Sequence, residues 1–407
     1  MSSVFPPEPV VSAQTSAQIA KTLAYTNHTV TVITSFPSRP AGKIFPGFFR
    51  KLVQRERSES GVEIVRCFST LSPESRMFSR LLENLSFGLT GGWQVLTMPR
   101  PDAIYANTWP IVATGILFMV ARLRRIPLVI SVQDIYPEAL IAQGRIKQNS
   151  VLARLVSWID GVIARNSAHV IVISERFADI YREQRRVPAE RLSLIPNWID
   201  SNQIDINVTG QEYRRSIGIA DQDFLVVYGG NVGVAAGVET VIEAMRLLVD
   251  TPAICLLIAG SGSQLAVCQQ LASTLPGERV LFHSPWAAEE TSQVLRAADL
   301  LVLPTQHEQS LASVPSKLLS YMLAGRPVLA TAVSGSDLAD LVTHAQCGWV
   351  VETDRPDLLS AQIREIVQLE PGERQRRGAN GRRYVLQHFA KDACLPRLLR
   401  ILEEAGQ

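Results

Sequence analysis

The sequence is poor in cysteine and histidine, and neither sign of charge is in marked excess. Its five cysteines lie far apart in 407 residues, and no two of them form a Cys-x-x-Cys pair. This pattern indicates neither a disulfide framework nor a zinc site, and it favours a reducing, cytoplasmic location. The six histidines are scattered and show no ligand spacing.

Charge and hydrophobicity are both ordinary. Forty Lys and Arg stand against 38 Asp and Glu, which gives a formal net charge of +2, and 46% of the residues are hydrophobic. This is a globular composition, neither disordered nor typical of a nucleic-acid-binding protein, so we expect no nucleic-acid partner. At roughly 100 to 200 residues per domain, the length indicates two domains.

Long hydrophobic runs are also absent. The longest, residues 111–121, has eleven residues, whereas a helix needs about 20 to cross a bilayer. We predict a core helix there. The first residues show no basic segment followed by an apolar one, so no secretion signal is visible, and any membrane contact would be peripheral.

Short β-branched runs alternate with amphipathic segments along the whole chain, which is the pattern of parallel sheets covered by helices. We therefore predict an α/β fold with two doubly wound, Rossmann-like domains. The predicted strands of the first half are 29–34, 62–67, 103–106, 128–132 and 170–173. Those of the second half are 224–228, 253–259, 279–282, 300–303, 328–331 and 348–351.

The boundary between the domains is predicted near 195–200, where a strand-like run ends in Pro196-Asn197 and a polar stretch follows. The first domain would span 1–196 and the second 197–385. The segment 371–405 reads as two helices, and we expect its last part, 386–407, to pack back on the first domain.

A central strand is missing at the amino end. Such a domain normally opens with a buried strand, yet Pro6 arrives after only five residues, and a strand usually needs about five or six. Either the start codon lies upstream or the first sheet lacks that strand. We favour a start assigned too late, because losing a central strand would expose unpaired backbone.

The stretch 310–330 carries the clearest chemical signal. Pro315 suits the first position of a helix, and Gly325 ends that helix before the strand 328–331. The free amides at a helix start attract anions, whereas Lys317 in the first turn would be mildly unfavourable without one. The alternative is a solvated surface lysine.

Two glycine turns follow predicted strands of the second domain. Gly229, Gly230 and Gly233 follow the strand 224–228, and Gly260-Ser261 follows the next strand. Glycine lets the backbone approach a ligand closely. A dinucleotide fingerprint is not complete, because Leu265 stands where its third glycine belongs. Each turn alone is more often just a turn.

Five motifs in order carry a resemblance to a known family. They are FPPEP at 5–9, VQDIYPE at 132–138, IPNWID at 195–200, YGGNVGVAAGVETVIEA at 228–244 and VPSKLLSYMLAGRPVLA at 314–330. Together they resemble family 4 of the retaining glycosyltransferases. Within it the chain is most similar to enzymes of bacterial exopolysaccharide, capsule and O-antigen clusters, including the colanic acid group.

The resemblance implies a GT-B architecture in which the first domain holds the acceptor and the second a nucleoside-diphosphate sugar. It implies no metal ion and no other cofactor. The reaction would be sugar transfer, with retained configuration, to a growing and lipid-linked glycan.

The resemblance also implies roles for individual residues. The catalytic candidates are Gln133, which stands where many members have a histidine, Asp134 and Lys317. The donor-binding candidates are Gly230, Asn231, Gly233, Gly260, Ser261, Ser284, Pro315, Ser316, Lys317, Leu318 and Ser320. The acceptor-binding candidates are Glu8, Ser12 and Glu138. Trp286 lies in the segment where the family usually holds the nucleobase, but a core role is at least as plausible.

The chain departs from the family pattern at several positions. Asn231 and Ala236 stand where members often carry Arg and Lys, and Ala312 and Ser320 replace a pair of glutamates. Phosphate neutralisation would then fall on Lys317, the amides around Ser316 and Arg326.

Basic and aromatic residues are interleaved in 39–57, with six Lys or Arg against one acid, Glu56. Such a segment suits an anionic membrane surface at the inner face of the membrane, and the alternative is a solvated loop.

Two other functions remain open. One is a nucleotide-sugar 2-epimerase, which the loss of acidic groups at 312 and 320 disfavours, and the other is a nucleotide-sugar-binding protein without turnover.

Overall fold

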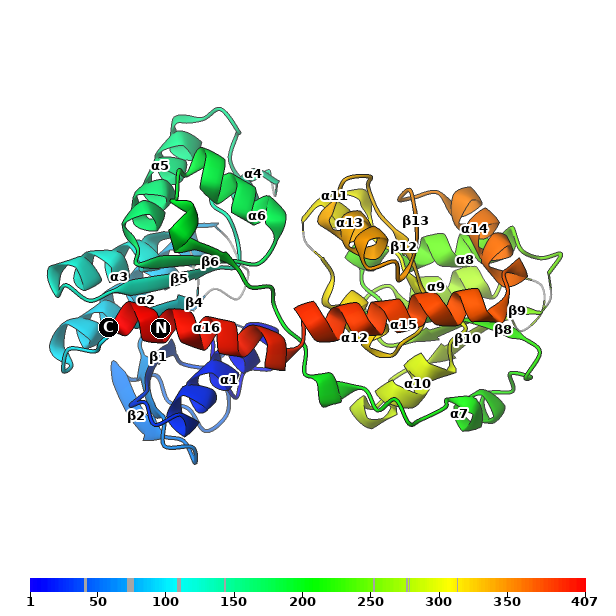
Figure 1. The fold of residues 1–407 in the computed structure, drawn as a ribbon, viewed down its shortest axis with the longest axis horizontal. Helices are drawn as coiled ribbons and strands as arrows, with labels where there is room; N and C mark the ends of the chain where they lie inside the picture. Colours follow the sequence, from blue (N-terminus) through cyan, green and yellow to red (C-terminus); the bar gives the residue numbers. More distant parts are fainter. Residues whose placement is uncertain are drawn as a thin grey trace. The chain divides into compact units, whose positions relative to one another are not determined.

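The computed structural model describes residues 1–39, 42–71, 77–107, 111–142, 144–251, 253–275, 277, 279–312 and 314–407. The chain forms two compact α/β units, Met1–Pro196 with Leu395–Gln407, and Asn197–Cys394 (Figure 1). The predicted α/β class with two Rossmann-like domains is confirmed.

The first unit holds two sheets, with strand orders β1-β3-β2 and β4-β5-β6-β7. Only the pairing of β2 with β3 is antiparallel. The strands are β1 (Thr31–Ser35), β2 (Val53–Arg57), β3 (Glu63–Cys67), β4 (Ile104–Asn107), β5 (Leu128–Val132), β6 (His169–Val172) and β7 (Leu192–Leu194). Its helices are α1 (Val11–Tyr25), α2 (Met77–Thr97), α3 (Ile111–Leu123), α4 (Glu138–Ala142), α5 (Val151–Asn166) and α6 (Glu175–Asp179), and most of α16 (Lys391–Gly406) belongs to this unit.

Residues 1–3 lie between the two sheets. The Ser2 N–H donates to the Ile33 carbonyl on β1 (3.0 Å), and the Asn107 N–H on β4 donates to the Met1 carbonyl (3.1 Å). These bonds bridge β1 and β4 where a central strand would stand, but the segment forms no regular strand. The buried amino group of Met1 donates to the Tyr105 carbonyl, and burial lowers the pKa of that amino group to about 5.

The second unit holds one parallel sheet of order β10-β9-β8-β11-β12-β13. Its strands are β8 (Phe224–Gly229), β9 (Ile254–Ala259), β10 (Val280–His283), β11 (Leu300–Leu303), β12 (Val328–Thr331) and β13 (Gly348–Val351). Its helices are α7 (Gln211–Ser216), α8 (Val238–Arg246), α9 (Leu265–Ala272), α10 (Thr291–Ala297), α11 (His307–Ala312), α12 (Ser316–Leu323), α13 (Asp337–His344), α14 (Pro356–Gln368) and α15 (Pro371–His388).

Both faces of this sheet are buried, as its continuous apolar strands require. Side chains of α10, α12 and α13 pack on one face, and side chains of α8, α9 and α14 pack on the other. All six strands run in one direction, so their carboxyl ends share one edge, where ligands of α/β proteins bind.

Each strand predicted from the sequence is present to within two residues. One strand, β2, was missed, so part of the segment interpreted as a basic loop is an edge strand. Strand β7 is the strand-like run that precedes Pro196, for which the sequence set no bounds. The predicted core helix at 111–121 is α3, which is buried on one side and exposed at Met119 and Leu123. Within the described residues, no helix combines the length and the apolar character that crossing a bilayer requires.

Helix α15 packs against the end of α12 through a glycine. A Cβ atom at Gly378 would lie 2.2 Å from the Gly325 carbonyl oxygen, which is a backbone atom with little freedom to move. This close approach supports α12, the helix that carries Lys317.

We expect Gly378→Ala to lower the free energy of unfolding by about 1 to 3 kcal/mol, because overpacking shifts backbone. Gly372→Ala, in the same helix with open space around it, should instead be neutral or stabilise by up to ~1 kcal/mol. Urea denaturation of both variants checks this prediction. Equal denaturation midpoints for the two variants would show that the close approach of Gly378 to the Gly325 carbonyl does not contribute to stability.

Candidate functional site

Most of the predicted donor-binding residues lie in turns at the carboxyl edge of the second sheet or at the start of α12. There the turns after β8 and β9 pack backbone against backbone. The Gly230 N–H donates to the Ala259 carbonyl (2.8 Å), and the Val232 N–H donates to that of Ser261 (2.9 Å). A Cβ atom at Gly260, whose φ is +146°, would lie 1.9 Å from the Gly230 oxygen. Only glycine fits at this position, so its presence has a structural cause as well as the predicted binding role.

Helix α12 brings Lys317 to the same turns. The Lys317 ammonium donates to the Tyr228 hydroxyl and to the Asn231 carbonyl (3.1 Å), and it lies 4.4 Å from the centre of the Tyr228 ring. The Tyr228 hydroxyl in turn donates to the Asn231 carbonyl (2.6 Å). Burial raises the pKa of this phenol, so it stays neutral.

The charge of Lys317 has no ionic partner among the described carboxylates. Burial lowers its pKa to about 8, because the charged form loses hydration. No side chain caps the start of α12 at Pro315, so its first amides add to the positive potential. A half-buried cation beside free helix amides is stabilised by an anion, and the predicted phosphate site is where these groups meet.

Tyr321 holds α12 to the end of β8, and no motif in the sequence singles this residue out. Its buried hydroxyl donates to the Gly229 carbonyl (3.0 Å) and accepts from the Gly229 N–H (2.8 Å). Its only signal was a polar atom on the apolar face of a helix.

Arg326 does not belong to this site, and its expected role in phosphate neutralisation is wrong. It follows the carboxyl end of α12, so it lies at the opposite edge of the sheet, just before β12. Its guanidinium donates to the Arg296 carbonyl, and burial lowers its pKa to about 10.

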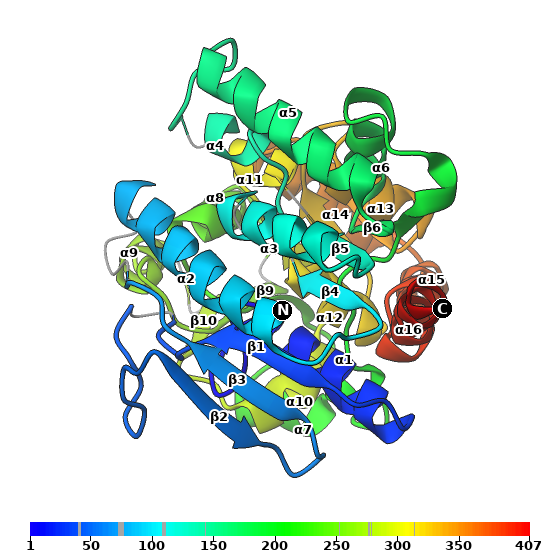
Figure 2. The same cartoon turned by 90° about the vertical axis from the view of Figure 1, so that its left-hand side faces the viewer.

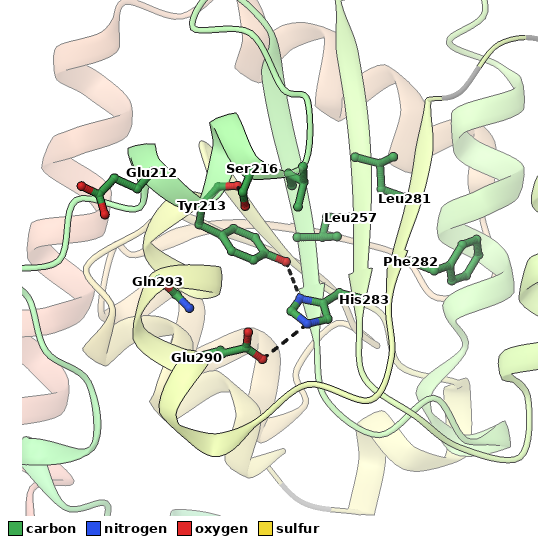
Figure 3. A pocket seen from close by; sticks show the side chains of 10 residues that line it. Glu212, Tyr213, Ser216, Leu257, Leu281, Phe282, His283, Glu290 and Gln293 are labelled. Atoms are coloured by element: carbon green, nitrogen blue, oxygen red, sulfur yellow. Dashed lines mark hydrogen bonds and ion pairs between the residues drawn. The ribbon is translucent and has the colours of Figure 1, made fainter.

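A pocket of about 610 Å³ opens beside the end of β10, and Figure 3 shows its lining side chains. The His283 ring stacks on Tyr213 (centroids 5.7 Å apart), its Nδ1 lies 2.6 Å from the Tyr213 hydroxyl, and its Nε2 lies 3.4 Å from Glu290 Oε2. The pocket lining also includes the apolar side chains of Leu257 and Leu281. Tyr213 is distant in sequence from His283 and Glu290, so no local pattern predicted the group.

The segment after β10 was the predicted nucleobase site. Ser284 is exposed there. Trp286 is partly buried against the core, with its indole 3.2 Å from the position of a Cβ at Gly229. The core interpretation of Trp286 is therefore the one that the structure favours. Among the other predicted donor residues, Asn231, Ser261 and Ser316 are exposed, Gly233 and Ser320 are half-buried, and Leu318 is in the core.

The other predicted residues lie in the first unit. Gln133 and Asp134 follow β5, as expected, and the Gln133 amide donates to Ser131 Oγ (3.2 Å). Partial loss of hydration raises the pKa of Asp134. Ser12 is half-buried at the start of α1.

Two predicted acceptor residues have structural partners. The buried Glu8 carboxylate accepts from the Ser38 and Arg39 N–H groups (2.9 Å each). Glu138 accepts from Arg185 at 2.6 and 2.7 Å. Their acceptor roles stay predictions.

No cluster of three or more His, Cys, Asp or Glu side chains able to hold a metal ion occurs in the described part of the chain.

The chain matches two family models, "Glycosyl transferase 4-like domain" over residues 12–198 and "Glycosyl transferases group 1" over residues 210–384. It is 24% identical over 374 residues to the putative colanic acid biosynthesis glycosyl transferase WcaI of Escherichia coli, covering 90% of each chain. Among solved structures, it is similar to Anabaena HepE in complex with UDP and glucose (TM-score 0.66, 17% identity, 98% and 97% of the chains). It is also similar to WaaG, a glycosyltransferase involved in lipopolysaccharide biosynthesis (TM-score 0.65, 19% identity, 98% and 97% of the chains).

The lowered pKa of Lys317 predicts how anion binding depends on pH. A bound diphosphate favours the ammonium form, so binding above about pH 8 requires uptake of a proton, and affinity for UDP should fall towards tenfold per pH unit. Below that value the lysine is already charged, and the dependence should flatten.

Titration calorimetry with UDP from about pH 7 to about pH 9 measures this slope. Lys317→Arg is the matched control, because arginine keeps its charge throughout the range. The same slope in both proteins would assign the pH dependence to another group.

Proposed function

The chain belongs to the family 4 glycosyltransferases of GT-B fold, and from this premise we propose that it transfers a sugar from a nucleoside diphosphate to a glycan, with retained configuration. The observation that carries the proposal is the unneutralised ammonium group of Lys317, held against the glycine turns at the start of α12. A diphosphate supplies the charge that this corner lacks.

The chemistry follows from where charge develops. As the bond between the anomeric carbon and the phosphate oxygen breaks, negative charge grows on the leaving diphosphate. Donors already aimed at that group stabilise the transition state more than the ground state. Lys317 and the first amides of α12 are such donors, and the bonds of Tyr321 to Gly229 limit their movement.

We further propose that no metal ion takes part, because the charge would be met by Lys317 and the helix amides. Gln133 and Asp134 would position the sugar or the acceptor hydroxyl, and we assign no protein nucleophile. The similarity to WcaI and WaaG, named for colanic acid and lipopolysaccharide biosynthesis, supports a surface polysaccharide as the product and a lipid-linked glycan as the acceptor.

Lys317→Ala should lower turnover by about 10² to 10³-fold, the usual effect of removing one such donor. Lys391→Ala is the matched control, because Lys391 also begins a helix, α16, and its backbone N–H donates to the Ile199 carbonyl, which is not part of the glycine turns. Release of UDP from UDP-sugar, followed with and without EDTA, measures the rate.

Near-normal turnover by a folded Lys317→Ala protein would refute the assignment. Analysis of the products separates the other functions. A 2-epimerase would release an altered free sugar, and a protein that only binds the donor would show saturable binding without turnover. Loss of activity in EDTA, restored by a divalent cation, would overturn the metal-free mechanism.

A further inference from the structure

Helix α2 exposes an almost purely apolar stripe. Six large apolar side chains point to solvent, and their exposed fractions run from 38% for Leu85 to 70% for Phe78. They recur every three to four residues, so they share one face of the helix. They are Phe78, Leu81, Leu82, Leu85, Leu89 and Trp93.

This stripe is not the face that α2 uses in the core. The core face carries Phe87 and Val95, each 2% exposed. Helix α3 packs at the border between this face and the stripe, where a Cβ at Gly88 would lie 2.9 Å from the Ala113 Cα and one at Gly92 would lie 3.1 Å from an Ile116 methyl carbon. Helix α2 is therefore apolar on both sides. A helix of this kind is normally buried all round, so the stripe is suited to a second apolar environment.

Neighbouring elements also expose apolar side chains. Figure 2 shows α2, α3 and α5 side by side on the first unit. Helix α5 exposes Val151, Leu155 and Trp158. On the other flank lie Phe49 and Leu52, exposed by 73% and 74%. The second flank is tied to α2 because the Phe68 N–H donates to the Leu52 carbonyl and the Thr90 hydroxyl donates to the Phe68 carbonyl.

The charges around this surface are of one sign. The described residues of α2, α3 and α5 include two acids, Glu83 and Asp160, and both are largely covered and paired with arginines. The exposed charged side chains on the three helices and the flank are basic. They are Arg50, Lys51, Arg122 and Arg154.

We propose that the α2 stripe and its flanks dock on an anionic phospholipid bilayer. Apolar side chains at helical spacing enter the boundary between headgroups and acyl chains, and basic residues beside them attract anionic headgroups. A symmetric contact between two copies fits less well, because it would bring the same basic residues of both copies to the rim of one interface.

The contact predicted at 39–57 is thereby reassigned. Phe45 and Phe48 are half-buried, and Phe48 lies under the Arg66 guanidinium, 4.9 Å from it. Arg55 is paired with Glu63 (2.7 Å) and donates to Gln94. Of that segment only the part from Phe49 to Leu52 flanks the stripe, and α2 supplies most of the apolar surface. Residues 40 and 41 lie outside the described part.

Flotation of the full chain with vesicles tests this proposal. The wild type should float with vesicles containing about 30% phosphatidylglycerol and bind pure phosphatidylcholine much more weakly. The double variant Leu85→Glu/Leu89→Glu should lose at least about tenfold in vesicle affinity. Arg50→Gln/Lys51→Gln should lose about 10- to 30-fold, at about fivefold for each charge.

The control is Leu247→Glu/Val249→Glu, which adds the same charge at positions of the second unit exposed by 46% and 53%. It should float like the wild type. Circular dichroism of each protein checks folding. If the Leu85→Glu/Leu89→Glu variant fails to fold, the Arg50→Gln/Lys51→Gln variant still tests the proposal.

Three results would overturn the proposal. They are no flotation of the wild type, flotation unchanged by both stripe and basic variants, and a wild-type dimer that the stripe variant converts to monomers without any vesicle binding. The last result would make the stripe an interface between copies. None of these outcomes depends on sugar transfer, so they leave the proposed function untouched.

Discussion

The ammonium group of Lys317 lies half-buried against the ring of Tyr228, and the two oxygens that accept its hydrogen bonds carry no formal charge. Taking a cation partly out of water without an anion costs free energy, and the lowered pKa of Lys317 reflects that cost. The fold maintains this arrangement through contacts that do not involve the lysine. An anion bound at this corner would offset that cost.

Those contacts connect the end of β8 to α12, and α12 to α15. The Tyr321 hydroxyl holds α12 to the last residue of β8, the turns after β8 and β9 interlock at Gly230 and Gly260, and α15 closes on α12 at Gly378. Because each contact engages backbone atoms, the position of the charge is set by the course of the chain. Such preorganisation is what makes a donor effective in a transition state.

The sequence predicted the buried parts of this protein well and its edges poorly. Short, continuous apolar runs that end in a glycine turn, such as 224–228, indicate core strands. Strand β2, with the sequence VQRER, is charged and shows no such pattern, and it forms a strand by pairing with β3. Arg326 was wrongly assigned to the phosphate site. The eight residues of α12, at ~1.5 Å each, carry the chain from that site to the opposite edge of the sheet. The group of Tyr213, His283 and Glu290 depends on tertiary packing. The stripe on α2 was missed because an apolar residue facing solvent looks, in sequence, like one facing the core.

The lowered pKa of Lys317 gives this position a chemical reactivity of its own. At pH 7 roughly one tenth of an amine with a pKa of about 8 is uncharged, against well under one thousandth for an ordinary lysine. Only the uncharged amine attacks acylating reagents, so limited labelling should favour this lysine over the freely hydrated ones. A bound anion would favour the protonated amine and protect it from the reagent. The extent of labelling at Lys317, measured by peptide mass spectrometry, would then report whether the site is occupied.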